Sequence, residues 1–264
     1  MVILITGITS GFGRAMASQL NADGHKVYGT FRRDSDRIPG VTYLKADVRD
    51  EESLKSAVNC VIAKEGRIDT VISNAGMGVG GPLEFTSLDD AQRQMDVNFM
   101  GMVRLLNLVV PIMRRQNQGH IICVSSIGGL MGLPYQGMYS ASKFAIEGYC
   151  EALRLEVRQF GIHVTVINPG DFFTGFTAAR SKNLPPEAAA AYPGYADSMA
   201  SIESDERSGL QPEYLARRIS RIIRKRNPAN RYIIATLVQK SSVILKAILP
   251  AKCFDKILGS YYEL

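Results

Sequence analysis

The segment Val2–Gly13, VILITGITSGFG, decides the fold of this chain. It begins with a short apolar run rich in Val and Ile, the kind that forms a strand buried on both faces. Gly7 then suits a tight turn, and Gly11 and Gly13 allow backbone and helix to approach a ligand closely. The helical stretch Arg14–Asp23 follows, so its free N–H groups and positive dipole end face the turn. The segment therefore predicts a strand–turn–helix unit that binds the pyrophosphate of a dinucleotide.

Beyond this unit, short apolar runs alternate along the chain with longer helical stretches. The short runs resemble strands covered on both faces, and the longer stretches can serve as crossover helices. The alternation predicts an α/β fold of the Rossmann type, with a doubly wound, mainly parallel seven-stranded sheet and helices on both faces. The expected strands are Val2–Thr6, Lys26–Phe31, Thr42–Ala46, Asp69–Ser73, His120–Ser125, His163–Asn168 and Tyr232–Ala235, and the expected long helices are Asp50–Glu65, Leu88–Gln116 and Met138–Phe160.

Two segments depart from this alternation. Residues 171–209 have a weak strand signal and many turn residues, including Leu184–Pro186 and Tyr192–Gly194. A long irregular insertion in a compact fold is more often functional than accidental, so we predict a substrate lid there. Residues 237–264 are expected to form a helical tail, and residues 1–264 together to form one dinucleotide-binding domain.

Composition limits the classes of protein that fit. Of the 264 residues, 46% are hydrophobic and 21% charged, as in ordinary globular proteins. The four cysteines have no CxxC or metal-ligand spacing, which predicts free thiols and no bound metal. The apolar run Val2–Ile5 is too short for a secretory signal, and no uninterrupted apolar stretch reaches the roughly 18 residues of a spanning helix. A cytoplasmic location is therefore expected.

Positive charge gathers at the C-terminal end. From Gln211 onward, 11 Lys and Arg stand against 3 Asp and Glu, a balance of +8. Such an end favours anionic surfaces, but no nucleic-acid-binding signature accompanies it. We take a solvated helix face as the default. The alternatives for the tail from Leu237 onward are that it caps the pocket, packs on a partner subunit or rests on a membrane surface.

The end of the second expected strand indicates which dinucleotide binds. NAD-binding turns usually place an acid there to bond the adenosine ribose hydroxyls. Here Lys26–Phe31 is followed by Arg32 and Arg33, with no carboxylate before Asp34. An arginine fork suits a 2′-phosphate through charge-assisted hydrogen bonds, to which Ser10 can add another. The sequence therefore favours NADP(H) over NAD(H), the alternative being two exposed arginines on a loop.

A Tyr-x-x-x-Lys pattern, Tyr139 and Lys143, opens the last long helix. Residues at i and i+4 share one helix face, so the two side chains can act together. Reduction of a carbonyl needs a proton donor at oxygen while a hydride attacks carbon. A tyrosine hydroxyl has a pKa near 10, which a nearby ammonium lowers toward the working range. The pattern predicts Tyr139 as the proton donor and Lys143 as its partner, placed also to hold the nicotinamide ribose.

Ser126 strengthens this prediction. It lies thirteen residues before Tyr139, at the end of the expected strand His120–Ser125. Open α/β sheets bind ligands at the carboxyl ends of their strands. A hydroxyl there can donate to the substrate oxygen and stabilise the charge that develops on it.

The TGxxxGxG spacing and the Ser, Tyr and Lys together resemble the short-chain dehydrogenase/reductase family, over about residues 1–235. The resemblance implies that Asn98 is the fourth catalytic residue and anchors a water linking Lys143 to solvent. It also implies that Asp47 and Val48 contact the adenine and that Thr174 contacts the nicotinamide carboxamide or the phosphates. The catalytic residues are then Asn98, Ser126, Tyr139 and Lys143, and the cofactor residues are Gly7, Thr9, Ser10, Gly11, Phe12, Gly13, Arg32, Arg33, Asp47, Val48, Asn74, Ala75, Gly76, Tyr139, Lys143, Pro169, Gly170 and Thr174.

Two further segments resemble one branch of that family. Ser126–Pro134, SIGGLMGLP, and Leu249–Phe254, LPAKCF, look like those of 17β-hydroxysteroid and retinol dehydrogenases. This implies hydride transfer to or from a lipophilic ketone or secondary alcohol, such as a steroid, a retinoid or a 3-keto sphingoid base. Asp171 stands where the family often has an apolar residue, which leaves its contacts open. The side chains that either line such a pocket or belong to the core are Met131, Leu133, Tyr135, Phe172, Phe173 and Phe176.

Other functions remain as alternatives. They are a non-catalytic NADP(H)-sensing scaffold, a reductase of small polar carbonyls, and a sugar-nucleotide epimerase or dehydratase. Retention of all four catalytic residues favours an enzyme over a scaffold. Only 55 residues follow Gly209, too few for the substrate domain of an epimerase. The resemblance also implies a homodimer or homotetramer formed through Leu88–Gln116 and Met138–Phe160.

Overall fold

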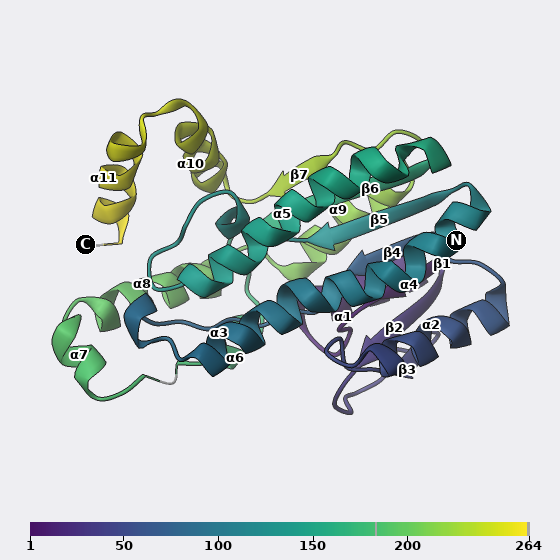
Figure 1. The fold of residues 1–264 in the computed structure, drawn as a ribbon, viewed down its shortest axis with the longest axis horizontal. Helices are drawn as coiled ribbons and strands as arrows, with labels where there is room; N and C mark the ends of the chain where they lie inside the picture. Colours follow the sequence, from purple (N-terminus) through teal and green to yellow (C-terminus); the bar gives the residue numbers. More distant parts are fainter. Residues whose placement is uncertain (183, 263–264) are drawn as a thin grey trace.

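The computed structural model describes residues 1–182 and 184–262, and it contains a seven-stranded sheet (Figure 1). The strand order is β3-β2-β1-β4-β5-β6-β7, and every pair is parallel. The predicted doubly wound fold is confirmed, and the sheet is wholly rather than mainly parallel. The strands are β1 (Val2–Ile5), β2 (Lys26–Phe31), β3 (Thr42–Lys45), β4 (Thr70–Ser73), β5 (Gly119–Val124), β6 (Ile162–Pro169) and β7 (Arg231–Ile234).

Helices cover both faces of the sheet (Figure 1). The order of the strands reverses between β1 and β4, and such a switch point leaves a crevice at the carboxyl ends of the strands. One apolar core joins the sheet to α2 (Glu51–Glu65), α4 (Gly101–Gln116) and α5 (Gly137–Val157). A second core joins the other face to α1 (Gly11–Ala22) and α9 (Pro212–Ile223). Short 3-10 turns are η1 (Leu83–Phe85), η3 (Ile127–Gly129) and η4 (Arg158–Phe160).

The predicted helix Leu88–Gln116 is continuous but not uniform. It consists of α3 (Leu88–Met95), a π-helical turn η2 (Asp96–Met100) and α4. A π turn accommodates one extra residue and re-aims the side chains in it, often at a functional site. Among the described residues, Leu88–Gln116 is the one helix long and apolar enough to cross a membrane by length and composition. Its α4 part buries Met102, Leu105, Leu106, Val109 and Met113 in the first core.

The predicted lid is helical rather than irregular. Its described residues contain α6 (Phe176–Ala179), α7 (Glu187–Ala191) and α8 (Tyr195–Ser208), while residue 183 lies outside the described part. Pro186 and Gly194 precede α7 and α8 directly. The predicted turn residues do lie in turns, and the structure differs from the expectation in the helices that fill the segments between them.

The tail forms two helices, α10 (Leu237–Ile248) and α11 (Ala251–Tyr261), which Figure 1 shows as a yellow hairpin beside the sheet. Thr236 and Gln239 form a reciprocal capping box at the start of α10. The hairpin returns to the lid, because the Ser198 hydroxyl donates to the backbone oxygen of Tyr262 at 2.7 Å. Met199, Ile202 and Tyr262 form a small apolar cluster at this junction. Residues 263 and 264 of the predicted tail lie outside the described part.

Candidate active site

Two glycines give the phosphate-binding turn its shape. Gly7 has a φ of +73°, a conformation that costs glycine little and other residues more. A Cβ on Gly13 would lie 1.9 Å from the backbone oxygen of Gly7, so a side chain there would push α1 away from the turn. Because α1 begins at Gly11, its free N–H groups lie beside the turn, as anion binding requires.

Asn74 fastens this turn to the end of β4. Its amide nitrogen donates to the backbone oxygens of Thr6 at 2.9 Å and Gly7 at 3.1 Å. In return, the Thr6 hydroxyl accepts from the backbone N–H groups of Asn74 and Ala75. The Asn-Ala-Gly segment therefore fixes the floor on which a dinucleotide would lie.

Asn98 lies in the π turn and is almost completely buried. Its side chain accepts from the backbone N–H of Met77 at 2.8 Å and donates to the backbone oxygen of Met77 at 3.1 Å. It also donates to the Ser142 hydroxyl at 3.0 Å, on the helix that carries Tyr139. The side chain thus braces two elements of the site, and the water link to Lys143 stays a prediction.

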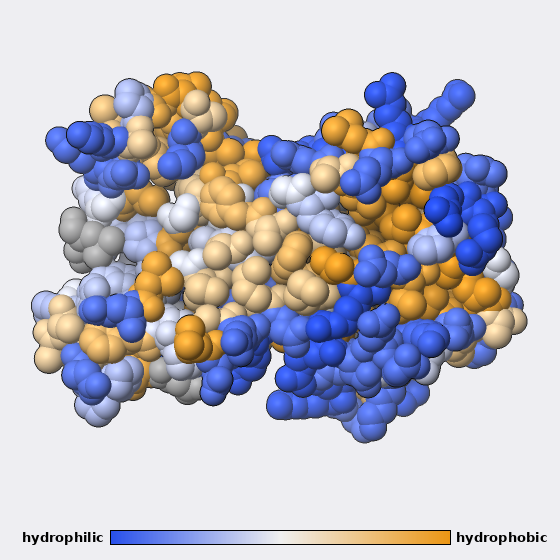
Figure 2. Space-filling view, viewed as in Figure 1, coloured by the Kyte–Doolittle hydropathy of each residue, from blue (hydrophilic) through white to orange (hydrophobic). Residues whose placement is uncertain are grey.

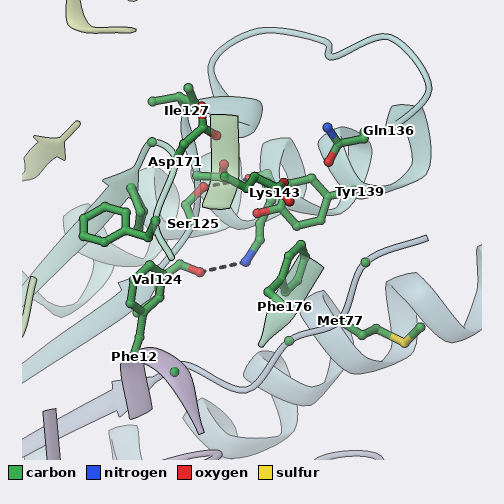
Figure 3. Close-up of a pocket in the computed structure, with 18 of the residues that line it drawn as sticks. Phe12, Met77, Val124, Ser125, Ile127, Gln136, Tyr139, Lys143, Asp171 and Phe176 are labelled. Atoms are coloured by element: carbon green, nitrogen blue, oxygen red, sulfur yellow. Dashed lines mark hydrogen bonds between the residues drawn. The ribbon is translucent and has the colours of Figure 1, made fainter. Parts of the chain in front are cut away.

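Ser126, Tyr139 and Lys143 meet at the carboxyl end of β5; Figure 3 labels the latter two beside Val124. The Lys143 ammonium donates to the backbone oxygen of Val124 at 2.9 Å and lies 5.6 Å from the centre of the Tyr139 ring. Ser126 and Tyr139 both line the cavity beside this lysine. The three predicted side chains therefore lie together, with two hydroxyls in reach of one substrate oxygen.

Burial controls the acidity of this pair. It raises the pKa of Tyr139 to about 12, which Glu206 and Asp171 reinforce and Ser126 and Arg180 oppose. Burial also lowers the pKa of Lys143 to about 8. The sequence predicted that Lys143 lowers the pKa of Tyr139, and the structure differs, because desolvation of the phenol dominates. Tyr139 is consequently a protonated phenol at neutral pH, the form that a proton donor needs.

A continuous cavity of about 1430 Å³ extends from the glycine turn past Tyr139 to the tail. Its walls include both Arg32 and Arg33 at one end and Ser126 and Lys143 further along. The fit to a nicotinamide dinucleotide rests on the tight glycine turn at one wall and the Tyr–Lys pair at the other. The predicted cofactor residues in its walls are Gly7, Thr9, Ser10, Gly11, Phe12, Arg32, Arg33, Asp47, Val48, Asn74, Ala75, Gly76, Tyr139, Lys143, Pro169 and Gly170.

Some predicted residues lie outside these walls. Gly13 lies beneath the turn, and Thr174 faces Gly11 from a neighbouring hollow. Of the six candidate pocket side chains, Met131, Leu133, Phe172 and Phe176 line the cavity. Phe173 is instead 52% exposed, and Tyr135 packs edge-on against Tyr192 and Tyr195. Neither side chain lines the cavity. Tyr135 packs against an apolar cluster, in line with the core alternative, and exposed Phe173 fits neither alternative.

The cavity also contains residues that sequence reasoning missed. Arg49 lies in its wall and forms an ion pair with Asp47 at 2.7 Å. Asp205 and Glu206 reach it from α8, and Leu245, Phe254 and Leu258 reach it from the tail. No local motif marks Asp205, Glu206, Leu245 and Leu258, which long-range packing of α8 and the tail brings to the site. Arg49 instead follows β3, and Phe254 ends the LPAKCF segment noted above.

Asp171 connects this acidic group to the tail. Its carboxylate accepts from the amide nitrogen of Gln239 on α10, 68 residues further along the chain. Burial raises the pKa of Asp171 to about 6, and the carboxylates of Glu206 and Asp205 add to that rise. Asp171 and Tyr139 line the same cavity, and Figure 3 labels both.

The chain belongs to the short-chain dehydrogenase family, whose profile matches residues 1–185. It is therefore a nicotinamide-dependent oxidoreductase that acts on CH–OH and C=O groups. A bound nicotinamide cofactor would supply the hydride in such a site, and the predicted roles of Tyr139 as proton donor and Ser126 as hydrogen-bond donor to the substrate oxygen fit their shared position in the cavity wall.

Named relatives narrow the comparison. The chain is 44% identical to a 3-ketodihydrosphingosine reductase of Bacteroides thetaiotaomicron, over all of this chain and 98% of the relative. It is 41% identical to estradiol 17-beta-dehydrogenase 1 of Rattus norvegicus, over 66% of this chain and 55% of the relative. It is 37% identical to retinol dehydrogenase 8 of Bos taurus, over 73% and 64%. The predicted likeness to hydroxysteroid and retinol dehydrogenases is confirmed. The chain spans 55% of the length of the first mammalian protein and 64% of the length of the second.

Solved structures agree on the fold and differ in cofactor. A short-chain dehydrogenase/reductase from Burkholderia phymatum in complex with NAD has a TM-score of 0.80 at 25% identity, over 92% of both chains. A serine dehydrogenase complexed with NADP⁺ has a TM-score of 0.77 at 25% identity, over 90% of this chain and 96% of that one. The choice between NAD and NADP therefore depends on this chain's own residues.

Proposed function

We propose that this protein is an NADPH-dependent reductase of a long-chain ketone that carries an amino group beside the carbonyl, the 3-keto sphingoid type. The observation that supports it most directly is the charge of the substrate end of the cavity. Asp171 and Asp205 lie in the cavity wall, and Asp171 raises the pKa of Tyr139, as a nearby negative charge does. A substrate ammonium next to the reacting carbonyl would neutralise this charge.

Asp171 and Asp205 differ from the neighbouring carboxylate of Glu206 in the side chains that they bind. Glu206 is ion-paired with Arg180, whose side chain is fully buried. Asp171 and Asp205 instead accept hydrogen bonds from the neutral side chains of Gln239 and Tyr261. Within the described residues neither has a salt-bridge partner, so both keep their capacity to bind a cation.

An apolar wall continues from this acidic end. It suits a hydrocarbon chain, because burial of each CH₂ group contributes about 0.8 kcal/mol. The tail supplies much of this wall, so the shape of the pocket depends on helices beyond the matched family profile. The apolar side chains are Met131, Leu133, Phe176, Ile202, Leu245, Phe254, Ile257 and Leu258.

The substrate proposal is tested by the rate of NADPH oxidation with four ketones. We expect kcat/KM for a long-chain 2-amino-3-ketone to exceed that for the matching ketone without nitrogen by roughly 10–100-fold, the value of one hydrogen bond to a charged group. A steroid ketone and a small polar carbonyl are expected to react more slowly still. Fastest turnover of either of these would contradict the proposal and favour the corresponding alternative.

The cofactor preference rests on the arginines at the other end of the cavity. Arg32, Arg33 and Arg49 lie in its wall. Of these three arginines, Arg49 is the one that forms an ion pair with Asp47. Arg32→Asp is expected to weaken NADPH binding at least tenfold and to leave NADH binding unchanged or tighter, because only NADPH carries the 2′-phosphate. Fluorescence titration with both nucleotides measures this. Arg37→Asp, in the same loop but outside the cavity wall, is the matched control; equal losses for the two nucleotides would count against the assignment.

We also propose that the protein forms a homodimer or homotetramer through α4 and α5. Figure 2 shows apolar side chains gathered over these two helices, on the face turned away from the sheet. Phe144 and Leu155 on α5 are 45% and 74% exposed. Light scattering is expected to give a multiple of 29.0 kDa, and a smaller multiple for Leu155→Glu. A wild-type mass of one chain would exclude this proposal.

The tail supports a further proposal, that the hairpin touches an anionic membrane surface from which a lipophilic substrate enters. It contains Asp255 as its one described acid. Replacing Lys240 and Lys246 with Gln is expected to weaken binding to phosphatidylserine-containing vesicles about 30-fold in a sedimentation assay, at about 1 kcal/mol per lysine. Lys55→Gln with Lys64→Gln on α2 is the control, and equal binding to purely zwitterionic vesicles would contradict the proposal. The exposed apolar residues are Leu237, Val238, Ile244 and Ile248, and the lysines are Lys240, Lys246, Lys252 and Lys256.

A further inference from the structure

A buried acid lies directly behind the Tyr–Lys pair. Glu147 follows Lys143 by one turn of α5 and is 6% exposed. One carboxylate oxygen accepts from the Asn168 amide at 2.7 Å, and the other accepts from the Arg231 guanidinium at 2.8 Å. A buried carboxylate is costly unless it is paired and hydrogen-bonded. Glu147 is absent from the cavity wall among the described residues, so its influence on the reaction must pass through its neighbours.

The first neighbour leads to Ser126. Asn168, at the end of β6, is completely buried, and its amide nitrogen donates both to Glu147 and to the backbone oxygen of Ser126 at 2.9 Å. The other side-chain atom of Asn168, Oδ1, is buried with no hydrogen-bond partner in the described structure. Because an unsatisfied buried acceptor costs free energy, this orientation of the amide is held by its two donated bonds.

The second neighbour is Lys143 itself. The titratable groups that face its ammonium are Tyr139 and Glu147 on α5 and Cys123 on β5. A hydrogen bond with Cys150, together with burial, raises the pKa of Cys123 far above its usual value, so that thiol is neutral. Glu147 is then the negative charge that opposes the effect of burial on Lys143.

We propose that Glu147 is a positioning residue for hydride transfer, which fixes Ser126 through Asn168 and stabilises the charged form of Lys143 from behind. Arg231, whose side chain is 39% exposed on β7, sets the strength of this effect by pairing with Glu147 from the solvent side. The inference rests on the dehydrogenase activity, and it is independent of which ketone is reduced.

The test measures the pKa of Lys143 directly, by competitive labelling of its amine in the cofactor-free protein across a pH series, read by mass spectrometry. Glu147→Gln is expected to lower this pKa from about 8 by about 1 unit, because the ammonium loses its nearby negative charge. Arg231→Gln is expected to shift it upward, because the Glu147 charge is no longer neutralised. Glu151→Gln is the matched control: Glu151 also pairs with Arg231, at 3.4 Å, but is 63% exposed and should leave the pKa unchanged.

The pH profile of kcat provides the second measurement. We expect its alkaline limb to move down in Glu147→Gln and up in Arg231→Gln, with KM for NADPH little changed at neutral pH. Shifts in the same direction, or parallel profiles with a uniform loss, would overturn the proposal and leave Glu147 a structural residue. If Glu147→Gln does not fold, Glu147→Asp keeps the charge and shortens the reach to Asn168. It should retain the wild-type Lys143 pKa while kcat falls, and a lowered pKa in that variant would also overturn the proposal.

Discussion

Tyr139→Phe is expected to lower kcat about 10²–10⁴-fold while NADPH binding stays within about twofold of wild type. The variant removes one hydroxyl and keeps the ring, which packs at 5.5 Å from Phe176. The hydroxyl that is lost belongs to a residue that shares the cavity wall with Ser126 and Lys143. Single-turnover NADPH oxidation and fluorescence titration separate the two effects, because the first reports chemistry and the second reports binding.

Tyr149→Phe is the matched control for this variant. Tyr149 lies on the same helix and packs edge-on against Phe99, a contact that the Phe ring retains. Its kcat should equal that of wild type. If Tyr139→Phe kept full activity, another group would have to supply the proton. If both variants bound NADPH and neither turned over any ketone, the protein would act as a cofactor-sensing scaffold.

The pKa of Tyr139 makes a further distinction. Because burial raises it to about 12, the phenol stays protonated at neutral and mildly alkaline pH. The phenol therefore contributes no titration to the pH profile of reduction near neutrality. A limb near pH 8 should then follow Lys143, whose pKa burial lowers to that value.

The residues of the reaction centre could be predicted from sequence because their geometry is local. Tyr139 and Lys143 share a face of one helix, and Ser126 lies two residues beyond the end of the preceding strand, β5. Helix periodicity and the parallel sheet fix those relations once the alternation of elements is recognised. The glycine turn is predictable for the same reason, since a Cβ on Gly13 would meet the backbone of Gly7 within the same unit.

The substrate end could not be predicted, because packing between distant segments creates it. Asp171 meets Gln239 across 68 residues, and Tyr261 meets Asp205 across 56. No periodicity in the sequence relates such pairs. The π turn around Asn98 could not be predicted for a different reason. Its one-residue irregularity leaves the apolar pattern of Leu88–Gln116 nearly unchanged.

Asp171→Asn is expected to reduce kcat/KM for a long-chain 2-amino-3-ketone roughly 10–100-fold and to leave the matching ketone without nitrogen almost unaffected. Asparagine keeps the oxygen that accepts from Gln239, so the link to α10 survives while the charge is lost. A hydrogen bond to a charged group contributes about 1.5–3 kcal/mol, which sets the size of the expected loss. Asp197→Asn, an exposed acid in the first turn of the helix that carries Asp205, is the control.

The same charge predicts how KM for the amino ketone changes with pH. Burial and the carboxylates of Glu206 and Asp205 raise the pKa of Asp171 to about 6, so its negative charge develops as the pH rises through that value. For the wild type, KM for the amino ketone should therefore fall between about pH 5 and 7, and the Asn variant should lose that step. Equal losses for both ketones would instead mean that Asp171 acts by holding α10 in place. The amine would then have no special partner at this site, and the protein would remain a reductase whose preference is set by its apolar wall.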